Sequence, residues 1–311
     1  MAQEVASRTI RADSNLERVL ASGGFAVTAE IAPPASADAS EIRRVAAQYR
    51  GLVDACNVTD GQRALVRMSS LAAAAIVLNE GLEPVMQMVS RDRNRIALQA
   101  DLLGASALGI RNVLCLSGDP PNAGNEKDAK GVFDLSTEEM IGTFRQLRDR
   151  GVLRGGEAVD QPPKMFIGAA ADPFRGTRED SFGNLRGKVT AGADFVQTQA
   201  VYDIDAFEDW MRLVRKEWLH DKAYILAGVI PLKSARMARF LVDKLGVVVP
   251  RHVLDRMEKA PNPSAEGKSI AVRTIKALKN IEGVRGVHIM PVGWDDVVPE
   301  LVNGAGLAPR P

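Results

Sequence analysis

The sequence is poor in the side chains that build disulfide frameworks and metal centres. Its 311 residues include two cysteines and three histidines, and aromatic residues make up 5%. Cys56 and Cys115 both lie in apolar runs, which is typical of small buried residues in strands. His220, His252 and His288 are scattered, with no cysteine or carboxylate at the spacing of a zinc ligand. We therefore expect neither a disulfide scaffold nor a protein-bound metal.

An excess of either charge is also missing. The chain has 40 Lys and Arg against 39 Asp and Glu, a formal net charge of +1, and no long run of like charges. A surface that binds duplex nucleic acid needs many uncompensated cations to release counterions from phosphates. No apolar stretch reaches the length of a signal-peptide core or a membrane span. We therefore expect no nucleic-acid partner, no membrane partner and a soluble, cytoplasmic protein.

Eight short apolar runs alternate with helical patterns along the chain. Nearly continuous apolar runs are typical of parallel strands that are covered on both faces. The runs lie at 25–31, 52–58, 83–89, 111–117, 164–170, 194–199, 223–230 and 286–292. Helices are expected at 38–50, 68–80, 93–108, 136–150, 179–192, 204–218, 233–245 and 295–305. Eight strands, each followed by a helix, predict a single (β/α)8 TIM barrel, with a doubly wound parallel sheet as the alternative.

Three segments depart from this alternation. Residues 247–282 predict extra helices inserted before the last strand. Residues 118–134 are too long and too polar for an ordinary turn, and long loops after barrel strands are usually functional. We expect residues 1–24 to form an N-terminal extension, frayed over 1–14, and residues 25–311 to form the catalytic barrel.

Polar residues at the carboxyl ends of the predicted strands are the candidates for chemistry. Glu30 lies inside the apolar run of the first strand, where burial favours the protonated carboxyl that a general acid needs. A structural carboxylate that pairs with an arginine is the alternative. Asp119 follows the fourth strand, and Gln199 ends the sixth, where its amide can both donate to and accept from a heterocycle. A lone glutamine is more often a satisfied core residue.

Nucleotide-binding loops are missing from the sequence. It contains neither GxGxxG after the first strand nor GxxxxGK[ST], which excludes a Rossmann fingerprint and a P-loop. A dinucleotide would have to lie on the barrel rim and contact basic residues such as Arg91, Arg93, Arg186 and Lys188. A solvated basic face explains these residues equally well. The serines, cysteines and histidines form no pattern for nucleophilic catalysis.

Taken in order, the strand ends resemble those of the methylenetetrahydrofolate reductase family. The matching pieces are AEIAPP, NVTDG, QMVSRDRNRIALQADLLGASALGIRNVLCLSGDPP, NLRGKVTAGADFVQTQAVYD and AGVIPL, and GVHIMPVGW resembles the closing strand of shorter bacterial members. The resemblance covers residues 25–306. It implies a (β/α)8 barrel that reduces methylenetetrahydrofolate to methyltetrahydrofolate, with hydride from NADH or NADPH passing through a bound flavin, usually FAD.

The resemblance also implies roles for individual residues. Glu30 matches the family's general acid, which would protonate the bridged folate nitrogen and open the ring to an iminium ion. Asp119 matches the aspartate between flavin and pterin, and Gln199, with Thr198 beside it, matches the glutamine that binds the pterin. The positions that would contact the flavin are Thr59, Gln87, Ser117, Gly118, Asp119, Ala169, Asn184 and Lys188.

Several positions depart from the family pattern. Gln87 stands where members commonly have histidine, and Ser117 and Gly187 stand where they often have arginine. A tyrosine expected after the fifth strand is replaced within 168–171, and Phe174 replaces a histidine. Each lost charged hydrogen bond costs about 1.5–3 kcal/mol, so several such losses weaken the binding of a flavin. Three alternatives for the cofactor are therefore open. They are FAD held differently, FMN in its place, or direct hydride transfer from the nicotinamide without a flavin.

The resemblance also bears on partners and on rival functions. Shorter relatives can work with a cysteine-rich partner that supplies electrons, and the two cysteines here do not suffice for such a centre. The chain could therefore be inactive alone and need a companion subunit. Pterin methyltransferases, which are also folate-binding barrels, are a further enzymatic alternative. We also expect a homo-oligomer.

Overall fold

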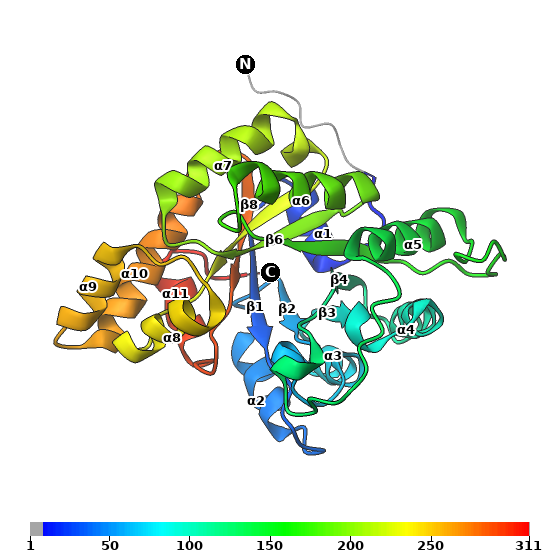
Figure 1. The fold of residues 1–311 in the computed structure, drawn as a ribbon, viewed down its shortest axis with the longest axis horizontal. Coiled ribbons are helices and arrows are strands. Elements are labelled where there is room, and N and C mark those ends of the chain that lie inside the picture. The colour runs from blue at the N-terminus through cyan, green and yellow to red at the C-terminus, as the bar shows by residue number, and fades with distance from the viewer. Residues whose placement is uncertain (1–8, 311) are drawn as a thin grey trace.

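A closed barrel of eight parallel strands, ordered β1 to β8, forms the centre of the computed structural model, which describes residues 9–310 (Figure 1). The strands are β1 (Ala26–Ile31), β2 (Ala55–Val58), β3 (Pro84–Val89), β4 (Asn112–Leu116), β5 (Phe166–Ala171), β6 (Phe195–Ala200), β7 (Tyr224–Val229) and β8 (Val284–Ile289). β8 pairs with β1, with His288 opposite Thr28, and this pairing closes the barrel. The predicted TIM barrel is confirmed, and the doubly wound sheet is excluded because the closed sheet leaves no edge strand.

Helices surround the barrel, most of them over its outer face (Figure 1). They are α1 (Asn15–Ala21), α2 (Ser40–Tyr49), α3 (Ser70–Asn79), α4 (Arg95–Ala107), α5 (Thr137–Arg150), α6 (Arg178–Ala191), α7 (Ile204–Lys216), α8 (Ala235–Leu245), α9 (Arg251–Lys259), α10 (Pro263–Leu278) and α11 (Val297–Gly304). Outward-facing strand residues such as Val27 and Ile167 belong to the same core as helix residues such as Leu98 and Phe144. Burial of this apolar layer drives folding.

Local sequence signals set the ends of the helices. Before α5, the Ser136 side chain accepts from the backbone N–H of Glu139, and the Glu139 carboxylate accepts from the backbone N–H of Ser136. This capping box satisfies donors that the first turn leaves free. α5 ends at Gly151, which adopts the left-handed conformation with φ +64°. α6 begins with the same type of box at Thr177.

The barrel interior changes from apolar to polar along the strands. At the amino end, α1 packs Leu16 and Leu20 into an apolar cluster of inward-facing residues, which are Ala26, Ala55, Val85, Leu114, Phe166, Phe195, Tyr224 and Leu226. Further along the strands, buried polar residues follow, namely Thr28, Asn57, Gln197, His288, Glu30 and Gln87. The polar half is the carboxyl end, where TIM-barrel active sites form.

Small residues in β5 are explained by packing inside the barrel. The rings of Phe166 and Phe195 stack with their centroids 4.9 Å apart. A Cβ atom on Gly168 would lie 2.2 Å from the Phe195 ring. Glycine at this position therefore allows the aromatic pair to fill the barrel.

The predicted extra helices within 247–282 are confirmed, because α9 and α10 lie between α8 and β8. Of these helices, α10 contacts β7 and β8 and takes the regular outer position, whereas α8 and α9 form an additional layer. α10 can lie this close to the segment after β7 because residue 267 is glycine. A Cβ atom at Gly267 would lie 1.7 Å from the Leu232 carbonyl oxygen. The apolar face of α10, with Ile275 and Leu278, continues the outer core.

The order of the described N-terminal residues and the first residue of β8 differ from the predictions. Residues 1–8 lie outside the described residues, but the part of 1–14 that is described is ordered by Glu17. The Glu17 carboxylate accepts backbone N–H bonds of 2.8–2.9 Å from Arg11, Ala12 and Asp13. β8 begins at Val284 instead of residue 286. In the described part of the chain, no helix is long and apolar enough to cross a membrane, and no group of three potential metal ligands is found.

Candidate active site at the carboxyl end of the barrel

Glu30 is a nearly buried carboxylate at the carboxyl end of the barrel, with a side chain 10% exposed. Gln62 Nε2 donates to its Oε1 at 3.4 Å, and Gln87 Nε2 donates to its Oε2 at 3.3 Å. His288 Nε2 lies 3.8 Å from Oε2. Within residues 9–310 no arginine forms an ion pair with Glu30, and this histidine is the basic side chain within 4 Å of the carboxyl. The arrangement therefore differs from the arginine-paired structural carboxylate that the sequence left open.

His288 joins Glu30 to a chain of buried polar side chains. His288 Nδ1 lies 2.9 Å from Thr28 Oγ1, and Gln197 Nε2 donates to Thr28 Oγ1 at 3.1 Å. The side-chain amides of Gln197 and Asn57 exchange two hydrogen bonds, of 2.6 and 3.0 Å. Because buried polar groups are costly unless they are satisfied, these contacts let the barrel interior be polar at this level. Sequence reasoning missed this row of hydrogen-bonded side chains. The signal that could have found it is that its members occupy inward-facing positions of their strands.

Burial explains the state of the two cysteines. Both thiols are free and buried. Desolvation raises the pKa of Cys56 well above its ordinary value, and the nearby charge of Glu30 acts in the same direction. Desolvation also raises the pKa of Cys115. The prediction of small buried residues in strands is confirmed, and neither thiol is a nucleophile at neutral pH.

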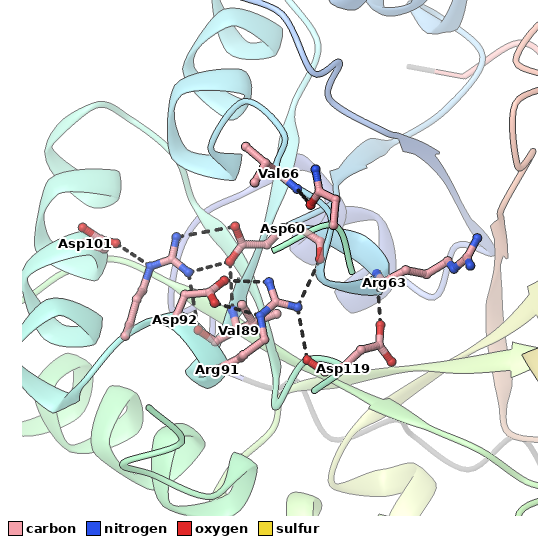
Figure 2. Close-up of polar contacts among 11 residues, drawn as sticks. Asp60, Arg63, Val66, Val89, Arg91, Asp92, Asp101 and Asp119 are labelled. Atoms are coloured by element: carbon pink, nitrogen blue, oxygen red, sulfur yellow. Dashed lines mark hydrogen bonds and ion pairs between the residues drawn. The ribbon is translucent and has the colours of Figure 1, made fainter. Parts of the chain in front are cut away.

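Asp119 lies on the loop after β4 and is exposed, in contrast to Glu30. Its Oδ2 accepts a 3.0 Å hydrogen bond from the backbone N–H of Arg63, as Figure 2 shows. Arg63 belongs to the short 3₁₀ helix η1 (Gln62–Ala64), whose first residue donates to Glu30. The structure thus brings both proposed catalytic carboxylates into contact with one short turn.

The two arginines that follow β3 are engaged in ion pairs (Figure 2). Arg93 contacts Asp60 Oδ2 at 2.6 Å through Nη1 and Asp101 Oδ2 at 2.8 Å through Nε. Arg91, whose side chain is nearly buried, contacts Asp92 Oδ2 at 2.6 Å. These pairs connect the segments after β2 and β3 and neutralise the arginines. The structure therefore favours a supporting role over the phosphate contact that the sequence also allowed.

Lys188 and Asn184 meet at the carboxyl end of β5. Lys188 Nζ donates to the Ala170 carbonyl at 2.7 Å and to Asn184 Oδ1 at 2.8 Å. Burial lowers the pKa of Lys188, while the charge of Glu138 opposes this change and that of the exposed Arg175 adds to it. Two cationic side chains of this kind suit an anionic ligand.

Other predicted positions are accessible near the barrel mouth. Gln199 and Ser117 are exposed, and Gly118 is partly exposed. Gly118 has φ +86°, and a Cβ there would lie 3.1 Å from Val89 Cβ. Glycine is therefore required at this turn both by its backbone conformation and by the close approach of β3.

Three predicted positions are buried supports of the site. Ala169 is fully buried, with its side chain in the outer core, whereas the alternation of side chains along β5 turns Ala170 inward. Thr198 Oγ1 donates to the Gln199 carbonyl at 2.8 Å and accepts from Gly228 N–H at 3.0 Å, which stabilises the irregular pairing of β6 and β7. Thr59 is 2% exposed at the end of β2.

The sequence profile described as "Methylenetetrahydrofolate reductase" matches residues 15–306. The chain belongs to the methylenetetrahydrofolate reductase family. Methylenetetrahydrofolate reductase 2 of Schizosaccharomyces pombe is 27% identical over 220 residues, which are 65% of this chain and 32% of that protein. The 5,10-methylenetetrahydrofolate reductase of Salmonella typhimurium is 21% identical over 234 residues, 74% of this chain and 72% of that protein. The chain spans about a third of the length of its fungal and nematode family relatives.

Solved structures agree with the barrel of this reductase family member. A Clostridium thermocellum protein, described as uncharacterised and as binding two copies of 5-methyl-5,6,7,8-tetrahydrofolic acid, has a TM-score of 0.63 at 14% identity. The likeness covers 93% of this chain and 97% of that chain. A 2,3-dimethylmalate lyase has a TM-score of 0.50 at 15% identity, over 95% of this chain and 85% of that chain. Identities this low show a shared fold alone.

Proposed function

We propose that this chain reduces methylenetetrahydrofolate to methyltetrahydrofolate with hydride from NADH or NADPH. The observation that carries the proposal is Glu30, a nearly buried carboxyl that two amides and a histidine surround at the carboxyl end of a barrel of this family. Relatives named for NADPH in Caenorhabditis elegans and for NADH in Arabidopsis thaliana support a nicotinamide as the source of hydride.

Glu30 is the proposed general acid, which donates its proton to the bridging folate nitrogen. The Gln62 and Gln87 amides can donate to the ionised carboxylate or, after rotation, accept from the protonated acid. His288 Nε2 lies 3.8 Å from the carboxyl, and the contact of its Nδ1 with Thr28 Oγ1 orients the ring toward Glu30. Both protonation states of Glu30 are thus accommodated, as an acid that is used in every turnover requires.

Asp119 and Gln199 are the proposed contacts to the opened ring and the pterin. Asp119 presents a carboxylate at the barrel mouth, with Oδ2 oriented by the Arg63 N–H. A negative charge in this place stabilises the iminium cation that forms when the folate ring opens. Gln199 is exposed at the end of β6, where its amide can both donate to and accept from the pterin.

Residues at the carboxyl end of β5 fit an anionic cofactor, and we assign them to FAD. Lys188, Asn184 and Arg175 would hold its phosphate groups, because they supply two cationic side chains and an amide donor near the carboxyl end of β5. Ser117 and Gly118 would meet the cofactor from the β4 side. A flavin bound here would supply a carrier for hydride between the nicotinamide and the folate.

The purified chain gives the test. With NADH or NADPH and methylenetetrahydrofolate under anaerobic conditions, we expect one methyltetrahydrofolate for each nicotinamide oxidised. We also expect a yellow protein that releases FAD on denaturation. A colourless but active protein would reject the flavin and favour direct hydride transfer, and release of FMN would identify the other flavin. Folate binding without nicotinamide oxidation would contradict the proposal and favour a cysteine-rich companion, and methyl transfer without nicotinamide consumption would favour a methyltransferase.

A further inference from the structure

One short turn at the end of β2 touches both proposed catalytic carboxylates. Gln62 Nε2 donates to Glu30 Oε1 at 3.4 Å, and the next residue, Arg63, donates its backbone N–H to Asp119 Oδ2 at 3.0 Å. Gln62 is exposed, whereas Gln87, the second amide at Glu30, is 7% exposed. Gln62 therefore approaches the carboxyl from the open side of the barrel and Gln87 from the buried side.

The backbone of this turn adopts a conformation that residues with side chains rarely occupy. The angle φ is +53° at Gly61, +58° at Arg63 and +55° at Ala64. Left-handed non-glycine residues are strained, and such strain persists only where the surrounding structure imposes it. It also clusters at active sites and ligand-binding turns.

Contacts from other loops impose the conformation of the turn. The Arg63 guanidinium lies over the ring of Phe240 in α8, 5.8 Å from its centroid. The loop after β4 packs so closely that a Cβ on Gly124 would lie 1.7 Å from the Ala64 carbonyl oxygen. Asp119 adds the hydrogen bond to Arg63 that Figure 2 shows. Because these contacts involve neither the Gln62 side chain nor Glu30, the turn keeps its place when the Gln62 side chain is changed.

We propose that Gln62 is a positioning residue for Glu30, placed on the open side of the carboxyl by a strained turn that Asp119 helps to hold. Its amide nitrogen donates to the ionised carboxylate, and its amide oxygen can accept from the protonated acid after rotation of the amide. The inference rests on the proposed role of Glu30. The inference adds that Gln62 orients the Glu30 carboxyl on the open side of the barrel, from which a substrate enters.

Few titratable groups face Glu30. His288 of β8 lies 3.8 Å away, and the charge of Glu30 also reaches Cys56 of β2 and Tyr49 of α2. Burial raises the pKa of the Cys56 thiol and of the Tyr49 phenol, so both stay neutral near neutral pH. His288 is the ionisable side chain within 4 Å of the Glu30 carboxyl, and all variants below keep it intact.

Two substitutions of similar size at Gln62 test the proposal. Gln62→Met keeps the length of the side chain but cannot donate to the carboxylate, and Gln62→Glu places a second carboxylate beside Glu30. Both changes disfavour the ionised form of Glu30, the second more strongly because like charges repel. The alkaline limb of the kcat–pH profile, which follows loss of the acid's proton, should move to higher pH by about half a unit in Gln62→Met and about one unit or more in Gln62→Glu.

The matched control is Gln161, an exposed glutamine in the segment before β5. Gln161→Met and Gln161→Glu should leave the alkaline limb where the wild type has it. If the limb of Gln62→Met coincides with that of the wild type, or if kcat falls equally at every pH, Gln62 has no positioning role. The methionine variant decides the matter alone if the glutamate variant fails to fold.

The protonation of Glu30 can also be followed without folate turnover, from its carboxyl band in infrared difference spectra, with Glu30→Gln as the blank. This second measurement distinguishes a failure of the proposed function from a failure of the inference about Gln62. Absence of folate reduction in the wild type overturns the proposed function. A carboxyl titration that is identical in wild type, Gln62→Met and Gln62→Glu overturns the inference about Gln62.

Discussion

The reciprocal amide pair inside the barrel allows the effect of a substitution to be worked out from the structure. Gln197 and Asn57 are 2% and 0% exposed and share hydrogen bonds of 2.6 and 3.0 Å. Gln197→Met keeps most of the side-chain volume but leaves the donor and the acceptor of the Asn57 amide unpaired. A buried polar group without a partner costs about 1–3 kcal/mol. Two such groups should lower the free energy of unfolding by about 2–6 kcal/mol.

A second substitution separates lost hydrogen bonds from altered shape. Asn57→Leu removes the other half of the pair and should be destabilising by itself, because it leaves the Gln197 amide oxygen unpaired while the amide nitrogen keeps its bond to Thr28. Replacement of both partners by apolar groups of similar shape is nearly neutral. We therefore expect Asn57→Leu/Gln197→Met to be more stable than Gln197→Met alone, although it carries one more substitution.

Urea unfolding, followed by circular dichroism and by tryptophan fluorescence, measures these differences. Transitions that coincide for the two probes justify a two-state free energy. Additive losses, with the double variant less stable than either single variant, would refute the reasoning, because additivity is the behaviour of residues that do not interact. A loss below about 1 kcal/mol in Gln197→Met would also refute it, since the Asn57 amide would then have found other partners.

Three further predictions concern packing, thiol reactivity and pH. Gly168→Ala should lower the free energy of unfolding by about 1–3 kcal/mol, because its Cβ would lie 2.2 Å from an aromatic ring of β6. Gly142→Ala, in α5 with open space around it, should raise that free energy by up to about 1 kcal/mol, and equal effects of the two substitutions in urea would contradict the packing argument. Cys56 and Cys115 should react with a thiol reagent only after denaturation, since burial raises both pKa values, and a rapid reaction of the native protein would contradict this. Burial also raises the pKa of Glu83, so the folded carboxyl binds its proton more tightly than the unfolded one. The stability due to this proton is present in acid and lost as the pH rises through the folded pKa, so the advantage of the wild type over Glu83→Gln should shrink as the pH rises from the ordinary pKa range of a glutamate into the neutral range in urea titrations. An advantage that grows over this range would oppose this reasoning.

The strands were predictable because parallel strands buried on both faces are continuous apolar runs. β3, for example, was expected at 83–89 and spans Pro84–Val89. α1 was not predicted, since a helix of seven residues depends on packing against the barrel and has too few turns for a periodic pattern. The outer position of α10 likewise depends on the close approach of Gly267 to another segment, which local patterns do not show.

Glu30 was predictable because a carboxylate inside an apolar run is unusual. Its partners were not, because Gln62, Gln87 and His288 come from three other parts of the barrel and meet only when the sheet closes. Ala169 shows a limit of matching family positions in the sequence. A family position can be matched in the sequence, yet the alternation of side chains along β5 directs that side chain into the outer core.

Glu30→Gln tests the central claim most directly, with two activities measured on one preparation. The account predicts that folate reduction by NADH or NADPH falls by about a hundredfold or more, the usual effect of removing a general acid. NADH oxidation by an artificial electron acceptor through the proposed flavin needs no proton from Glu30 and should stay close to the wild-type rate. Folate turnover at the wild-type rate in Glu30→Gln would contradict the account.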